Sequence, residues 1–138
     1  MQLDSVLKNI QIARPQLVYM PSDSFLIQNA SRVSKVLQEA KILSMSATEG
    51  PIRQDGFVMG LVSPYSNAGA LAGYKAHQIL VEGIDPGDVP ISGLDKFAFI
   101  INMKSALDIG FYPKIRALGF AEVINVPTQI SKPRPQSR

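Results

Sequence analysis

Three apolar runs in the first half of the chain each end in a short polar loop, and this arrangement constrains the fold more than any other feature. Helix-like segments follow the loops, as expected when parallel strands alternate with helices. In an open α/β sheet the loops at the carboxyl ends of the strands gather on one edge, where ligands bind. The three junctions run from Leu17–Met20 into Pro21–Ser24, from Ile42–Met45 into Ser46–Gly50, and from Phe57–Val62 into Ser63–Tyr65.

The segments between the strands have helical periodicity. From Ser24 to Ala40, apolar residues recur at spacings of three and four, which predicts one amphipathic helix packed on a sheet. Residues 3–12 are predicted to be helical, and so are residues 67–82, with Ala72, Ala76 and Ile79 facing inward. The alternation of strands and helices predicts an α/β protein with a three-layer α/β/α, Rossmann-like architecture and a mostly parallel sheet.

The second half of the chain continues the sheet. In residues 96–101, bulky apolar side chains occupy every second position, which predicts a strand with Phe97, Phe99 and Ile101 on one face. Two short helices and a last strand at residues 122–124 follow. Residues 127–138 contain three prolines and three basic residues, so we predict a disordered tail.

The composition excludes several classes of function. A length of 138 residues suits one domain, and a net charge of +3 without a basic, aromatic patch argues against nucleic acid as a partner. The chain has no cysteine and one histidine, so no metal site is expected. It has no glycine-rich nucleotide loop and no nucleophile elbow, so no cofactor is expected. No segment resembles a signal peptide or a membrane span.

The loop Ser22-Asp23-Ser24 has the chemistry of a binding site for a small zwitterion. Asp23 can pair with a ligand ammonium group, and free N–H groups at the start of the next helix favour a ligand carboxylate. The competing interpretation is that Asp23 or Ser24 only caps that helix, and position alone favours this interpretation.

The other two loops have similar alternatives. Ser46, Thr48 and Glu49 are candidate ligand contacts, but Thr48 also suits an N-cap and Glu49 suits the first turn of a helix. Ser63 and Tyr65 supply a hydroxyl group and an aromatic wall, or else Tyr65 is packed for stability. The eight candidate ligand-binding residues are therefore Ser22, Asp23, Ser24, Ser46, Thr48, Glu49, Ser63 and Tyr65.

Several stretches resemble the substrate-binding proteins of ABC transporters, in the family whose characterised members bind aromatic amino acids. They occur in the order that the family has, and together they span about residues 3–126. The most specific is the run from Lys96 to Ala106 with the preceding turn. The stretches are Tyr19–Phe25, Ser46–Gly50, Gly60–Tyr65, Gly69–Gly83, Val89–Ile91, Lys96–Ala106 and Ala121–Ile124.

The resemblance implies that residues 1–126 form an incomplete C-terminal lobe of a type I periplasmic-binding-protein fold. It implies a solute-binding component of an ABC-type importer, not an enzyme, in which two lobes close on a small polar ligand such as an amino acid. The partners implied are that solute and an ABC permease, and the location implied for the full-length protein is the periplasm or the cell surface. Because family members are about twice as long, we expect a fragment that binds weakly and forms a homodimer through uncovered edges.

Two alternatives stay open at the level of the sequence. The first is a ligand-sensing module of the same fold that regulates a partner. The second, less favoured, is a small flavodoxin-like enzyme that uses Asp23 and Glu49 as an acid/base pair, which requires the two carboxylates to lie close together.

Overall fold

The computed structural model describes residues 3–127, and its five strands form a single sheet in chain order. The first three strands are parallel, the fourth is antiparallel to the third, and the fifth is parallel to the fourth. The predicted α/β fold with a mostly parallel sheet is confirmed. The strands are β1 (Leu17–Met20), β2 (Leu43–Ser46), β3 (Met59–Val62), β4 (Ala98–Asn102) and β5 (Glu122–Ile124).

Seven helices accompany the sheet in the described part of the chain. The single helix predicted over residues 24–40 is wrong, because the chain breaks at Asn29. The Asn29 side chain donates to the Phe25 carbonyl at 2.8 Å, a local bond that competes with a continuous helix. The helices are α1 (Leu3–Ala13), α2 (Ser24–Gln28), α3 (Ala30–Glu39), α4 (Glu49–Arg53), α5 (Tyr65–Leu80), α6 (Met103–Asp108) and α7 (Ile115–Leu118).

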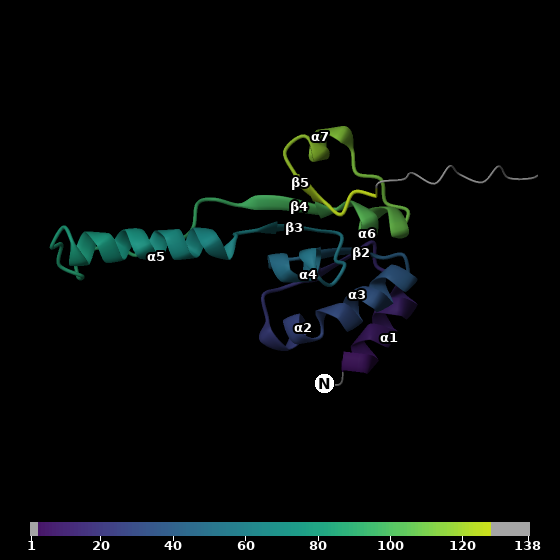
Figure 1. The fold of residues 1–138 in the computed structure, drawn as a ribbon. Helices are drawn as coiled ribbons and strands as arrows, with labels where there is room; N and C mark the ends of the chain where they lie inside the picture. Colours follow the sequence, from purple (N-terminus) through teal and green to yellow (C-terminus); the bar gives the residue numbers. More distant parts are fainter. Residues whose placement is uncertain (1–2, 128–138) are drawn as a thin grey trace, which may run out of the picture.

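The order of the strands decides which face of the sheet the helices cover. The connections from β1 to β2 and from β2 to β3 step in the same direction, so right-handed crossovers place their helices on one face. Figure 1 shows α1 to α4 together on that side. Strand β4 runs the opposite way, so the right-handed connection from β4 to β5 carries α7 to the other face, where Figure 1 places it. The two faces are therefore covered unequally.

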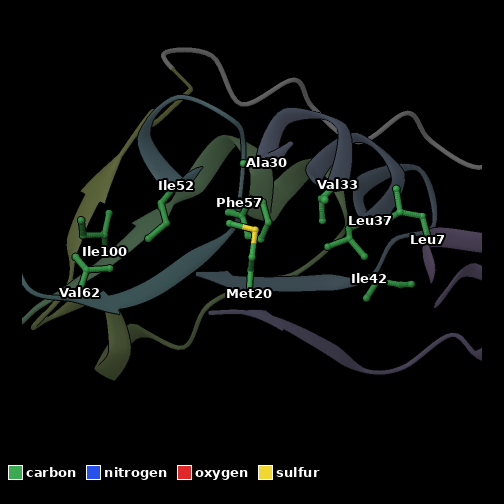
Figure 2. Packing of buried hydrophobic residues seen from close by; sticks show 10 residues of the cluster. All are labelled: Leu7, Met20, Ala30, Val33, Leu37, Ile42, Ile52, Phe57, Val62 and Ile100. Carbon is green, nitrogen blue, oxygen red and sulfur yellow. The ribbon is translucent and has the colours of Figure 1, made fainter. Parts of the chain in front are cut away.

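The core lies between α1 to α4 and the sheet. Leu37, Ile52, Phe57 and Ile100 are fully buried there, and Figure 2 shows them in one continuous layer with Met20, Val33 and Val62. Apolar burial of this kind is the main favourable term in folding. Within the same layer, the buried Ser44 hydroxyl accepts a hydrogen bond from the Val58 N–H at 3.0 Å, which joins β2 to the start of β3.

Helix α5 lies apart from this core. Figure 1 shows it beyond the end of the sheet, joined to the body only through β3 and β4. None of its residues is buried, and Ala72 and Ala76 are exposed, so the prediction that they face inward is wrong. The reason is topological: β3 and β4 are adjacent and antiparallel, so their connection starts and finishes at one edge and need not cross the sheet.

The remaining predictions on the second half are mostly confirmed. Strand β4 begins at Ala98 and places Ile101 in a buried position, and Phe97 before it is exposed. Strand β5 lies where the last strand is predicted. The disordered tail predicted for residues 127–138 falls, apart from Pro127, outside the described residues.

Strands β2 and β3 approach closely at Gly60, and this contact gives a test of the fold. A methyl group at Gly60 would lie 2.3 Å from the Ser46 carbonyl oxygen and 2.5 Å from the Ile52 Cδ1 atom. We expect Gly60→Ala to lower the free energy of unfolding by about 2 kcal/mol, the usual cost of overpacking. Gly50→Ala in α4 is the matched control, because nothing lies within 4 Å of its added methyl group. Urea unfolding of both variants measures the difference; equal stabilities would contradict the close approach.

Candidate functional site

The three polar loops that follow β1, β2 and β3 lie on one edge of the sheet. The strands are parallel, and Met20 at the end of β1 pairs with Ser46 at the end of β2. The Ala47 N–H also donates to the Met20 carbonyl at 3.0 Å, which holds the first two loops side by side. The polar side chains predicted to share an edge therefore do share one.

The first loop presents its polar side chains to solvent. Ser22, Asp23 and Ser24 are all exposed. One carboxylate oxygen of Asp23, Oδ1, accepts a hydrogen bond from the Leu26 N–H at 2.9 Å, so Asp23 is the N-cap of α2. The second oxygen has no hydrogen bond and no ion-pair partner within residues 3–127. Capping thus leaves half of the carboxylate available to a ligand.

The second loop is more enclosed. Ser46 is completely buried, and its hydroxyl donates to the Thr48 carbonyl at 2.9 Å and accepts from the Thr48 N–H at 3.1 Å. Thr48 is half-buried and precedes α4 at the N-cap position, but its side chain makes no capping hydrogen bond. Ser46 thus holds the loop in shape, and the Thr48 hydroxyl is left near the edge.

Glu49 is held by an arginine one turn further along α4. The Arg53 Nε atom donates to Glu49 Oε2 at 3.2 Å, and the two terminal nitrogens of Arg53 bind the carboxylate of Glu122 at 2.7 and 2.9 Å. The bidentate bond to Glu122 is the main reason why the pKa of Arg53 is raised, and the same bond lowers the pKa of Glu122. This arrangement ties α4 to β5.

In the third loop, one polar side chain forms a hydrogen bond within the protein and the other is exposed to solvent. The half-buried Ser63 donates from its hydroxyl to the Lys96 carbonyl at 3.1 Å, which joins the end of β3 to the segment that returns to β4. Tyr65 at the start of α5 is 66 % exposed. Of the eight predicted residues, Ser22, Asp23, Ser24, Thr48 and Tyr65 have side chains that solvent or a ligand can reach most directly.

The sequence analysis missed Arg53, which lies at the far end of α4 from this edge and holds Glu49. The spacing of four from Glu49 to Arg53 is the usual helical ion-pair spacing and could have identified the first contact. The contact between Arg53 and Glu122 joins residues 69 apart in the chain, and no sequence pattern marks it.

Two cavities lie away from this edge. One, of about 490 Å³, runs along α5 and is lined by Leu71, Ile79 and the segment 89–94 among others. The other, of about 300 Å³, lies near the ends of β4 and β5 and contains Asp55, whose pKa burial raises. Within residues 3–127 no three potential metal ligands cluster, and no helix there is both long and apolar enough to cross a membrane.

Comparison with known proteins decides the family. The family model described as ABC transporter substrate binding protein matches residues 1–118. The chain belongs to this family. The resemblance inferred from the motifs is therefore confirmed.

Individual relatives agree with this assignment. A tyrosine-binding protein of Clostridioides difficile strain R20291 is 32 % identical over 91 residues, which are 66 % of this chain and 26 % of that protein. A ligand-free, open substrate-binding protein with adhesive properties from Clostridium difficile has a TM-score of 0.70 at 20 % identity, covering 88 % of this chain and 40 % of that one.

Another solved structure, an ABC domain in complex with L-Trp from Streptococcus pneumoniae, has a TM-score of 0.70 at 18 % identity. It covers 87 % of this chain and 41 % of that chain. The two structural likenesses confirm the fold of a substrate-binding protein. The chain spans about a quarter of the length of the curated relative and about two-fifths of the solved structures.

The capping bond of Asp23 predicts a difference between two substitutions. Asp23→Ala removes the acceptor for the Leu26 N–H and is expected to cost about 1 kcal/mol of unfolding free energy. Asp23→Asn keeps an acceptor at the same position and is expected to be nearly neutral. Thermal or urea unfolding measures both, and equal losses for the two variants would contradict the capping role.

The ion pair between Arg53 and Glu122 predicts a dependence on pH. Because the folded state lowers the pKa of Glu122 below its ordinary value of 4.5, the pair stabilises the fold at neutral pH. That stability is lost as the pH falls below 4.5 through the lowered pKa. Solvent reaches both side chains, so the expected loss in Glu122→Gln at pH 7 is at most about 1 kcal/mol. Unfolding measured from pH 7 to pH 3 should show the two proteins converging; a constant gap would refute the pair's contribution.

Proposed function

We propose that this chain forms one wall of a solute-binding cleft in the binding component of an ABC-type importer, and that the solute is an amino acid. The observation that carries the proposal is the shared edge of β1 to β3, where Asp23 keeps one free carboxylate oxygen beside exposed hydroxyl groups. Family membership supports a binding role, and the relative named as a tyrosine-binding protein supports an amino acid.

In this proposal, five of the eight candidate residues contact the ligand and three hold the loops in place. We assign Asp23 to the ligand ammonium group, and the hydroxyls of Ser22, Ser24 and Thr48 to its polar atoms. Tyr65 supplies an aromatic surface beside them. The other three residues position the edge through bonds within the protein: Ser46 shapes the second loop, Glu49 is held by α4, and Ser63 anchors the return segment.

A binding role without catalysis fits these contacts better than an acid/base pair. The Glu49 carboxylate accepts a hydrogen bond from Arg53 Nε at 3.2 Å, and Arg53 also binds Glu122. Glu49 is therefore already engaged within the protein, and an acid/base pair with Asp23 would compete with this contact. The remaining groups at the edge are hydroxyls without a neighbouring base. We therefore propose that the protein holds its solute unchanged and without a cofactor.

The partners of the whole protein follow from the same proposal. A binding component of an importer works outside the cytoplasmic membrane, with its permease as the partner, and a second lobe supplies the opposite wall of the cleft. Closure of two such lobes on a ligand is a hinge motion. Self-association through uncovered edges is also proposed, because β1 and β5 each have one unpaired side within residues 3–127.

A substitution that preserves the cap tests the binding proposal. Asp23→Asn retains the acceptor for the Leu26 N–H and removes only the negative charge. We expect it to weaken the binding of an aromatic amino acid by at least about tenfold, the scale of one charge-assisted hydrogen bond. The matched control is Asp95→Asn, which removes the same charge at an exposed position of the return segment.

Calorimetry or NMR titration with L-tyrosine, L-tryptophan and a neutral sugar measures the difference. Unchanged binding in Asp23→Asn would contradict the assignment of Asp23 to the ligand ammonium group. Because one lobe supplies only part of the contacts, binding by the chain alone is expected to be weak. Nanomolar affinity would contradict the view that this edge is half of a site.

A further inference from the structure

The polar cavity of about 300 Å³ lies at the edge of the sheet opposite the candidate solute site. Strand β4 runs antiparallel to β3, so β4 and β5 end at the edge where β3 begins. Figure 1 shows this end of the sheet, with α6, away from α5. The cavity collects residues from the end of α3, the turn between α4 and β3, α6, and Asn125 after β5. About ten water molecules would fill it, so a molecule of monosaccharide size fits.

One wall of the cavity is the turn at Gly56. This residue has a φ of +85°, in the left-handed region that favours glycine. The Gln38 Nε2 atom donates to the Gly56 carbonyl at 2.8 Å, which fixes the turn against α3. A methyl group at Gly56 would lie 2.6 Å from that nitrogen and 3.6 Å from the Ser105 Oγ atom. The Ser105 hydroxyl therefore lies beside a fixed turn, at a position that carries no side chain.

The hydroxyl of Ser105 is the first group in this cavity that lacks a protein partner. Ser105 is only 4 % exposed and lines the cavity. Its backbone N–H donates to the Asn102 side chain at 3.2 Å, but its hydroxyl forms no hydrogen bond within residues 3–127. No fully enclosed side-chain nitrogen or oxygen in that range lacks a partner, so this hydroxyl opens into the cavity. A buried hydroxyl normally bonds to water or a ligand when the protein offers nothing.

The carboxylate of Asp55 is the second such group. Asp55 is half-buried, and its side chain forms no hydrogen bond or ion pair in the part of the chain that the structure describes. Burial raises its pKa, and no neighbouring cation offsets that effect. Two cations line the same cavity, but both are bound to other carboxylates. Arg53 is bound to Glu122 at 2.7 and 2.9 Å, and Lys104 to Asp108 at 2.6 Å. One negative charge in the cavity therefore lacks a counter-ion.

We propose that this cavity binds a small hydroxylated ammonium ion without a carboxylate, of the size of an amino sugar. The Asp55 carboxylate pairs with the ammonium group, and the Ser105 hydroxyl bonds to a ligand hydroxyl. The side-chain amides of Gln54 and Asn125 line the cavity, form no hydrogen bonds within residues 3–127, and serve the remaining hydroxyls. An amino acid is disfavoured here, because its carboxylate would meet those of Asp55 and Asp108. The site is thus separate from the polar edge and its solute.

Titration of the full chain with D-glucosamine and D-glucose, by calorimetry and NMR at about pH 6, tests the site. The two sugars differ at one position, where glucosamine has an amine that is protonated at this pH and glucose has a hydroxyl. We expect glucosamine to shift backbone amide signals near residues 54–56, 104–108 and 125. Glucose is expected to bind at least about tenfold more weakly. Equal binding of the two sugars, or no measurable binding of glucosamine, would overturn the proposal.

Substitutions at the two unpartnered groups separate this site from a general attraction of cations. Asp55→Asn removes the charge at nearly the same volume, and because burial disfavours that charge, the variant should fold normally. We expect glucosamine binding at least about tenfold weaker in Asp55→Asn and about fivefold weaker in Ser105→Ala. The matched controls at exposed positions, Asp88→Asn and Ser31→Ala, should bind as the unchanged chain does. Unchanged binding in Asp55→Asn, or an equal loss in Asp88→Asn, would overturn the proposal.

A basic side chain from the polypeptide itself is the competing occupant of the cavity. Residues 128–138 contain three basic residues, and the variant with Lys132→Gln, Arg134→Gln and Arg138→Gln removes their charges together. Glucosamine binding should be the same in this variant. Tighter binding would mean that the chain fills its own cavity, which would overturn the proposal.

The same variants distinguish this site from the proposed solute-binding function. Asp23→Asn should bind glucosamine normally, and Asp55→Asn should bind L-tyrosine as the unchanged chain does. Loss of glucosamine binding in Asp23→Asn would overturn the separate site, whereas normal binding of L-tyrosine in Asp23→Asn counts only against the solute-binding function.

Discussion

Three parallel strands laid down in chain order, β1 to β3, are the constraint on which the rest of this structure depends. Parallel direction brings the three polar loops to one edge, and the close approach at Gly60 fixes β3 against the end of β2. Right-handed connections that always step the same way place α2 to α4 on one face, which leaves the opposite face of the same strands open. Because β4 runs antiparallel to β3, the connection that contains α5 does not cross the sheet, and α5 does not pack on it. The candidate site, the uncovered face of the sheet and the exposure of α5 thus share one topological origin.

Charged and hydroxyl groups at the polar edge serve two purposes, and the structure separates them. Buried or half-buried groups are satisfied within the protein: Ser46 by the backbone of Thr48, and Glu49 by Arg53. Unsatisfied buried polar groups are costly, so these bonds are a condition of folding. Exposed groups keep atoms that can still form hydrogen bonds, above all the second oxygen of Asp23. A ligand can bind only to such atoms, which is why the exposed half of the edge carries the proposed function.

Sequence patterns predicted the features that depend on residues close together in the chain. The apolar runs located every strand. The interpretation that Asp23 or Ser24 caps the next helix is confirmed for Asp23, because a cap needs only residues three positions away. The predictions failed where the outcome depends on distant contacts. The periodicity of α5 indicates an amphipathic helix, yet only the antiparallel pairing of β3 with β4 decides that Ala76 faces solvent. The family resemblance came from motifs in their correct order and was confirmed by the match over residues 1–118.

The central claim is that Asp23 and its neighbours hold the ammonium group of an amino acid at the carboxyl edge of β1 to β3. The most direct measurement is an NMR titration of this chain with L-tyrosine and, in parallel, with the same molecule lacking its amino group. The account predicts shifts of backbone amide signals confined to residues 22–26, 47–49 and 63–65, present with L-tyrosine and absent with the deaminated analogue. Equal shifts with both ligands, or shifts confined to the second half of α5 or to the opposite edge of the sheet, would contradict it.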